Sequence, residues 1–297
     1  MPDVDLKPGS PEWLRTVTAS KIPVILGVSR YKSQYTLWHE MAGLLEPEPI
    51  SQQTQELFDY GHAAEVAAAE FWKWRNPGWR LSQREVQYSR DDLPFPNAAT
   101  LDRRASRGRS RKAVEVKTAE SLEEWGDDGS GEMPADYAAQ VIWQQYLSGF
   151  TDPADLVLWP TFGRPRIYTV EFSEVRAEAI VAKASAWTAS LAAGTPPPLD
   201  TTISCYETVR RLHPDIERDR EVEISPDLAA RYLTANADRK VIDVEERGTK
   251  TEVLSEMGQA QYATCQGYRI ADRRNAKGGT VALYANTKTD FLEGIPA

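Results

Sequence analysis

Three residues near the middle of the 297-residue chain have the types and the spacing to bind a metal ion: Asp102, Glu115 and Lys117. Glu115 and Lys117 are two positions apart, so in a strand their side chains point to the same face. If the preceding segment folds back as a hairpin, Asp102 comes level with Glu115. Hard divalent cations such as Mg²⁺ prefer carboxylate oxygens, and such a cation stabilises charge on a phosphodiester and activates a water. The pattern therefore predicts a metal site whose lysine orients the water or offsets phosphate charge.

An ordinary surface salt bridge explains the same spacing, because Glu-x-Lys on a strand is common. Two features favour the metal site. Val114 and Val116 flank Glu115, which indicates a central strand with an apolar second face. The stretch between Asp102 and Glu115 is also strongly basic and would hold a phosphodiester, although a solvated loop explains any single cation in it equally well; these cations are Arg103, Arg104, Arg107, Arg109, Arg111 and Lys112.

A predicted helix over residues 52–75 precedes these strands. The segment is rich in Ala, Glu and Gln and ends at Asn-Pro-Gly. Gly61 and Glu65 lie four apart and so share one face of the helix. Glu65 is placed to supply a third carboxylate, and the alternative is that it is one of several exposed glutamates.

A second predicted helix, over residues 135–147, follows them. Gln140 and Gln144 lie four apart on one face of this helix. Glutamines on an inner face can bond to a catalytic lysine, a water or a phosphate. A polar stripe that faces solvent is the alternative.

The order of helix, strands, helix, strands and helix predicts an α/β protein whose mixed sheet is flanked by helices. The strands are expected at residues 79–88, 97–103, 113–118, 155–160 and 165–172. The clearest linker is Gly-Thr-Pro-Pro-Pro at residues 194–198. We therefore expect one domain over residues 1–195 and a mostly helical extension over residues 196–297, with a long polar helix and then a hairpin over 268–284.

Composition narrows the class of protein. No stretch approaches the roughly 18 apolar residues of a membrane span, and the acidic N-terminus is unlike a signal peptide, which predicts a cytoplasmic protein. Cys205 and Cys265 are too few for an iron–sulfur cluster or a structural zinc site. The net charge of −9 counts mildly against a nucleic acid as partner, but a local basic patch on an acidic protein remains compatible with it.

The motifs in their order resemble the YqaJ-like viral recombinase family, which includes the phage lambda exonuclease and lies within the PD-(D/E)xK nuclease superfamily. The resemblance rests on G-x(3)-E at Gly61–Glu65, Leu101-Asp102, Glu115-Val116-Lys117, Tyr137-x(2)-Gln140 and the N-terminal residues Trp13, Arg15 and Thr18-Ala19-Ser20-Lys21. It extends from about residue 13 to about residue 190. Leu101 stands where the superfamily has a proline, and Ile142 where many members have a second glutamine.

The resemblance implies a restriction-endonuclease-like core and an exonuclease that uses Mg²⁺, with Mn²⁺ as a substitute. Such an enzyme degrades one strand of double-stranded DNA from the 5′ end and leaves 3′ overhangs for a single-strand annealing protein. A homotrimeric ring and a phage or prophage origin in a bacterial host are also implied. The alternatives are another PD-(D/E)xK endonuclease or repair nuclease, or a catalytically silent DNA-binding scaffold.

The resemblance also implies roles for individual residues. The implied metal ligands are Asp102, Glu115, Glu65 and the carbonyl of Val116. Lys117 would position the nucleophile, and Gln140 would hold the lysine or the substrate. Arg15 and Ser20 match the region that holds a terminal 5′ phosphate. We expect further DNA contacts from Arg103, Arg104 and Gln144.

Overall fold

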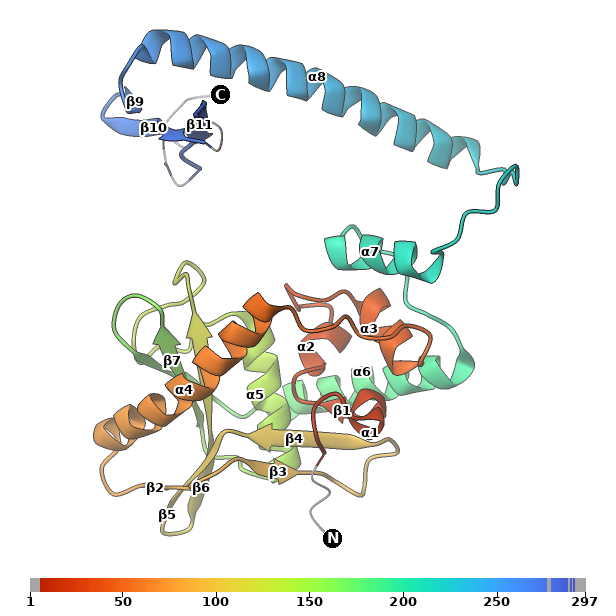
Figure 1. Ribbon diagram of the computed structural model, residues 1–297. Coiled ribbons are helices and arrows are strands. Elements are labelled where there is room, and N and C mark those ends of the chain that lie inside the picture. Colours follow the sequence, from red (N-terminus) through yellow and green to blue (C-terminus); the bar gives the residue numbers. More distant parts are fainter. Residues whose placement is uncertain (1–5, 277–278, 288, 290, 292–297) are drawn as a thin grey trace. The chain divides into compact units, whose positions relative to one another are not determined.

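The computed structural model describes residues 6–276, 279–287, 289 and 291. The chain divides into two compact units, residues 1–216 and residues 217–297, and each is described by itself (Figure 1). Among the described residues, no helix combines the length and apolarity that a membrane span requires.

The first unit is built on a five-stranded mixed sheet with the strand order β2-β5-β6-β7-β8. The central strand, β6, pairs antiparallel with β5 and parallel with β7. Antiparallel pairs also join β2 to β5 and β7 to β8. The bounds are Arg80–Leu81 for β2, Arg103–Arg107 for β5, Ser110–Ala119 for β6, Ala154–Pro160 for β7 and Arg166–Val170 for β8.

Helices α4 (Gln52–Arg75) and α5 (Ala135–Ser148) cover the two faces of this sheet (Figure 1). Helix α4 begins where the hydroxyl of Ser51 accepts a hydrogen bond from the Thr54 N–H, and it ends at Asn76, just before a proline. Its Ala68 and Trp72 pack on the valines of β6 and β7. Helix α5 packs on the other face and ends at Gly149, whose φ of +70° suits a residue without a Cβ. The predicted mixed α/β core flanked by helices is confirmed.

A second sheet, β1-β4-β3, adjoins the first through the chain itself, because β4 and β5 are separated by Asp102 alone. Strand β1 (Val17–Thr18) pairs parallel with β4 (Asn97–Leu101), and β3 (Val86–Tyr88) pairs antiparallel with it. The remaining helices of the unit are α1 (Pro11–Arg15), α2 (Ile22–Ile25), α3 (Gln34–Met41), α6 (Glu174–Ala193) and α7 (Ile203–Leu212).

The first compact unit extends beyond residue 195 because α7 packs against α3. The hydroxyl of Thr36 contacts those of Ser204 and Thr208, each at 2.8 Å. Thr208 and Cys205 are buried in this contact. The proline-rich segment after residue 194 therefore lies within the first compact unit. The expected division into a domain over residues 1–195 and a mostly helical extension over residues 196–297 stays a prediction.

The second unit consists of one long helix and a small sheet. Helix α8 (Pro226–Met257) begins at Ser225, whose hydroxyl accepts from the Leu228 N–H. The sheet has the order β11-β10-β9, with bounds Tyr262–Cys265 for β9, Tyr268–Asn275 for β10 and Val281–Ala285 for β11. The expected hairpin is the pair β10–β11, and part of its loop lies outside the described residues. Strand β9 was not expected from the sequence.

Two local expectations were wrong. Residues 79–88 do not form one strand, because the segment turns after Leu81, where the Ser82 hydroxyl donates to the Arg84 carbonyl at 2.8 Å. The two halves enter different sheets as β2 and β3. The basic stretch after Asp102 is not a loop but the hairpin β5–β6, which turns at Gly108 with a φ of +59°.

Candidate active site

The strand register brings Asp102 level with Glu115. Strand β5 pairs with β6 so that Arg103 lies opposite Val114, and the residue before Arg103 therefore lies opposite the residue after Val114. The backbone N–H of Val116 donates to Oδ2 of Asp102 at 2.7 Å. The chain thus fixes a carboxylate at the point where it passes from one sheet to the other.

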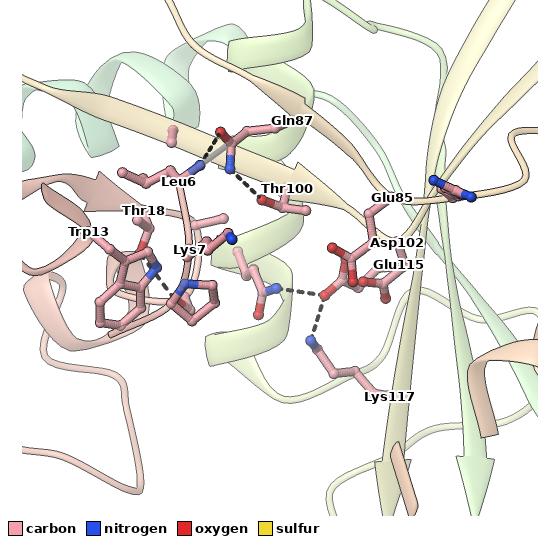
Figure 2. Close-up of a pocket in the computed structure, with 16 residues that line it drawn as sticks. Leu6, Lys7, Trp13, Thr18, Glu85, Gln87, Thr100, Asp102, Glu115 and Lys117 are labelled. Carbon is pink, nitrogen blue, oxygen red and sulfur yellow. Dashed lines mark hydrogen bonds and ion pairs between the residues drawn. The ribbon is translucent and has the colours of Figure 1, made fainter. Parts of the chain in front are cut away.

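Glu115 lies at the centre of a buried hydrogen-bond network, with 2% of its surface exposed. Its Oε1 accepts from Nζ of Lys117 at 2.5 Å and from Nε2 of Gln140 at 2.6 Å (Figure 2). Its Oε2 accepts from Nε2 of Gln144 at 2.6 Å. The same amide nitrogen donates to the carbonyl of Thr100 at 3.0 Å, which ties α5 to β4. Both oxygens of Glu115 are therefore held in place by side chains of β6 and α5.

A second set of carboxylates meets at Asp102. Glu65 of α4, Glu85 and Asp102 each offer one oxygen, and these three oxygens lie within 4.8 Å of one another. Ligand oxygens around one hard cation are separated by at most twice the metal–oxygen distance, roughly 4.2 Å for Mg²⁺ and 5 Å for Ca²⁺. The donor chemistry fits a hard divalent cation, and a spacing of up to 4.8 Å lies within the limit for Ca²⁺, whereas Mg²⁺ would draw the oxygens closer together. Arg103 lies at the margin of this cluster, with Nη1 3.8 Å from Oε2 of Glu65.

The electrostatics of the cluster reflect an excess of negative charge. Burial raises the pKa of Asp102 well above its usual value, and the charge of Glu115 raises it further. Burial and the neighbouring Glu85 raise the pKa of Glu65. Burial lowers the pKa of Lys117, but Glu115 and Asp102 outweigh that effect, so its pKa is raised and the ammonium form is favoured. A divalent cation would relieve this repulsion.

Glu85, Asp102 and Glu115 lie at one end of a cavity of about 740 Å³ (Figure 2). The N-terminal segment, with Leu6, Lys7 and Trp13, forms the opposite end (Figure 2). The remaining lining residues come mainly from the segment around β1, from β3 and from β4, and they include Thr18, Ala19, Ser20, Arg84, Gln87, Ala98, Thr100 and Gln140. The cavity is thus acidic where it meets β6 and carries cationic and hydroxyl groups elsewhere.

Lys21 holds the N-terminal wall of the cavity together. Its side chain is 3% exposed, and Nζ donates to the carbonyls of Trp13, Leu14 (3.0 Å) and Thr16 (2.9 Å). An ammonium has three N–H donors, so these carbonyls fully satisfy it. The lysine therefore orders the turn that carries Thr18 and Ser20 to the cavity.

The structure brings together only part of the predicted site. Asp102, Glu115, Lys117, Glu65 and Gln140 converge as described, and Ser20 lines the cavity. Gln144 is fully buried beneath Glu115 and faces that carboxylate. Val116 donates its backbone N–H to Asp102. The role of its carbonyl as a metal ligand stays a prediction.

The expected basic residues are dispersed. Arg15 is exposed and lies outside the cavity lining, as does Arg104, whose backbone N–H donates to Ser82. Lys112 is tied up in a partly buried ion pair with Asp155, with Nζ 2.6 Å from Oδ2. This pairing removes Lys112 from the expected cationic patch.

Sequence reasoning missed Glu85, which supplies the third oxygen of the acidic cluster. The spacing of Glu85 and Gln87 could have indicated it, because residues two apart in a strand point to the same face. Both side chains indeed line the cavity. Lys7 and Arg84, two cations of the cavity wall, gave no pattern in the sequence that set them apart from other charged residues.

Comparison with known proteins confirms the family resemblance. Residues 12–151 match the YqaJ-like viral recombinase domain, a segment that includes Glu65, Glu85, Asp102 and Glu115. A curated relative is the uncharacterised protein YqaJ of Bacillus subtilis, 21% identical over 277 residues, which cover 87% of this chain and 81% of the relative.

Solved structures of an alkaline exonuclease from Laribacter hongkongensis are also similar to this chain. The first is 16% identical with a TM-score of 0.44 and covers 62% of this chain and 94% of the exonuclease. The second, in complex with dAMP, is 17% identical with a TM-score of 0.46 and covers 68% and 94%.

Proposed function

We propose that this protein, whose residues 12–151 match the YqaJ-like viral recombinase domain, is a divalent-metal-dependent DNA exonuclease. One observation carries the proposal. Three carboxylate oxygens within 4.8 Å of one another lie beside the buried Glu115–Lys117 pair, at the end of a cavity with cationic walls. Metal-assisted phosphodiester hydrolysis can use both parts, because a cation held by carboxylates stabilises the phosphate charge and an ammonium group beside it adds to that stabilisation.

Each residue has a role that follows from its position. Asp102, Glu65 and Glu85 would hold the cation, which supplies Lewis-acid stabilisation of phosphate charge when bound. Glu115 holds Nζ of Lys117 and is itself restrained by Gln140 and Gln144. Lys117, favoured as an ammonium, donates a hydrogen bond to an attacking water or to a phosphate oxygen. Lys7, Ser20 and Arg84 can receive the remaining phosphate charge along the cavity wall.

The finer features rest on the family resemblance. We propose that Mg²⁺ is the preferred cation, with Mn²⁺ as a substitute, and that one strand of duplex DNA is degraded 5′→3′. The resulting 3′ overhang would pass to a single-strand annealing protein. A homotrimer and a phage- or prophage-derived role in the bacterial cytoplasm belong to the same proposal.

The test is digestion of linear duplex DNA that carries a 5′ phosphate on one end only. We expect Mg²⁺- or Mn²⁺-dependent release of nucleotides from that end, no release in EDTA, and faster degradation of the phosphorylated strand. Covalently closed circular DNA is the matched control, because it has no end. Absence of degradation with both metals would refute the proposed nuclease activity. Cutting of the closed circle would show that the protein is an endonuclease and not an exonuclease.

A further inference from the structure

The small sheet of the second unit presents a row of aromatic side chains. In the register of β9, β10 and β11, Asp272 lies opposite Tyr262 on one side and Tyr284 on the other. Residues directly opposite each other on neighbouring strands point to the same face of a sheet. Both tyrosines therefore lie on one face, which we call the tyrosine face, and their side chains are 41% and 47% exposed.

A bulge in β10 adds an arginine to this face. Arg269 and Asp272 are three apart, so in a regular strand they would point to opposite faces. The register between β10 and β9 shifts between Arg269 and Ala271, so that one extra residue is accommodated there. Such a bulge re-aims the side chains before it. Arg269 consequently lies over Tyr262, with its guanidinium 3.8 Å from the ring centroid.

The second tyrosine is paired in the same way. Arg274, two residues after Asp272, lies over Tyr284 with its guanidinium 5.0 Å from the ring centroid. It also pairs with Asp272, Nε to Oδ2 at 2.5 Å, and its side chain remains 64% exposed. The face therefore carries two arginine–tyrosine stacks in a row across three strands.

The opposite face of the sheet packs within its own unit. Ala271 is 4% exposed and Met257, at the end of α8, is 8% exposed. Arg273, also on this side, donates to the carbonyl of Gly258, which follows α8. The tyrosine face is thus the one that the described residues of this unit leave to solvent.

The charge of this segment departs from that of the chain. Residues 259–287 include four Lys or Arg and a single Asp, a net charge of +3, whereas the whole chain has −9. On the tyrosine face itself, Arg269 and Arg274 outnumber Asp272. A positive, aromatic surface on an acidic protein fits a partner that is negatively charged and has planar groups. Nucleic acid has both, and only a single strand exposes its bases for stacking.

We propose that the tyrosine face binds single-stranded DNA, with bases stacked on the Tyr262 and Tyr284 assemblies and phosphates held by Arg269 and Arg274. Bases stack both on aromatic rings and on guanidinium planes, so the arginine–tyrosine pairs offer two stacking surfaces each. None of these residues lines the acidic cavity. The choice of DNA over RNA rests on the proposed function, which leaves a single DNA strand as product.

Binding can be measured without cleavage. Anisotropy of a fluorescein-labelled 25-nucleotide oligo(dT) with the full chain in EDTA reports Kd directly. A base–aromatic stack contributes about 1–3 kcal/mol, so we expect Tyr262→Ala with Tyr284→Ala to raise Kd at least about tenfold. Tyr262→Phe with Tyr284→Phe should stay within about twofold, because the ring is kept.

The arginines provide an independent measurement. Each phosphate contact on a single strand contributes a slope of about −0.7 to log K against log salt, so Arg269→Gln with Arg274→Gln should reduce the slope by about 1.4. Tyr206→Ala with Arg210→Ala is the matched control, since it removes an exposed arginine–tyrosine stack on α7 (5.6 Å) and should leave Kd unchanged.

Several outcomes would overturn the proposal: no binding of oligo(dT) by the wild-type chain, equal loss in the α7 control, or at least tenfold tighter binding of oligo(rU). If the alanine pair fails to fold by circular dichroism, the phenylalanine and glutamine pairs decide the question. A Kd within about twofold in the first and a salt slope reduced by about 1.4 in the second are then both required. EDTA excludes cleavage, so the two proposals are tested separately. A negative binding result would not argue against the proposed nuclease activity, and a negative digestion result would not argue against this binding site.

Discussion

Two of the three sheets in the described part of the chain carry the same short pattern, an acidic and a basic residue two positions apart on one strand. In β6 the pair is Glu115 and Lys117, and in β10 it is Asp272 and Arg274. The distance is 2.5 Å in both cases. The surroundings differ, since the side chains of the β6 pair are 2% and 21% exposed and those of the β10 pair 18% and 64%.

Position in the sheet causes this difference. Strand β6 is the third of five strands, and α5 places two glutamines directly on Glu115. Strand β10 is central in a sheet of three strands whose one face is open. Coulomb interactions are strong in a desolvated site and are screened at a surface. The surroundings of the β6 pair therefore suit the proposed chemistry on a phosphate, whereas those of the β10 pair suit the proposed binding surface.

The largest expected effect is on the buried base. Lys117→Ala removes the ammonium beside the acidic cluster, and we expect the rate of duplex digestion to fall at least about 10³-fold. Folding and binding of duplex DNA in EDTA should persist. Lys250→Ala is the matched control, because Lys250 forms an exposed ion pair with Glu246 on α8. A Lys117 variant that keeps most of its activity would contradict the proposed role.

The next largest effect is expected when Gln144, which donates to Glu115, is replaced. Gln144→Ala should lower the digestion rate about 10- to 100-fold, because Gln144 orients Glu115, which holds Lys117 beside the proposed metal site, and outer-shell partners of metal sites commonly matter to that extent. It should also destabilise the fold by about 1–3 kcal/mol, since it removes the buried amide that donates to Oε2 of Glu115 and to the Thr100 carbonyl. Gln140→Ala should lower the free energy of unfolding, measured by chemical denaturation, by less than Gln144→Ala does, because Gln140 is only half-buried. Equal losses of unfolding free energy for the two variants would show that the deeper burial of Gln144 does not matter.

The third prediction is a smaller effect, a gain in the stability of the metal-free protein where the variants above bring losses. Because the pKa of Asp102 is raised in the fold, the folded state binds more protons than the unfolded chain above pH 3.8, and metal-free stability falls as pH rises through that window. Asp102→Asn removes this penalty, so the Tm in EDTA should rise by a few degrees at pH 8 and by less at pH 6. Digestion should nevertheless be lost. A Tm that drops equally at both pH values would show that the carboxylate is needed structurally.

The smallest effect is expected for the exposed pair. Arg274→Ala should change the free energy of unfolding by no more than about 0.5 kcal/mol, because an exposed ion pair contributes little. Urea denaturation of this variant beside Gln144→Ala compares the two sheets directly. A loss of 2 kcal/mol or more (the figure expected for a buried partner) would mean that the β10 pair is as structural as the β6 pair.

The sequence by itself determined the elements with strong periodicity. Helix α4 has the predicted bounds, α5 differs by one residue, and the apolar flanks of Glu115 correctly indicated a central strand. Repeating apolar positions and capping residues are local signals, so they can be read without knowing the fold. The same locality explains why the spacing of Asp102, Glu115 and Lys117 could be recognised.

Only the tertiary structure decided which polar residues meet. Glu85 joins the acidic cluster because its segment turns from one sheet to another, and Gln144 is buried beneath Glu115 because α5 packs there. The predicted basic loop became a hairpin that hides Lys112 in an ion pair, and a bulge turned Arg269 onto the tyrosine face. Acid–base pairs two apart look alike in the sequence, and the burial that separates a reactive pair from a surface pair arises only from long-range packing.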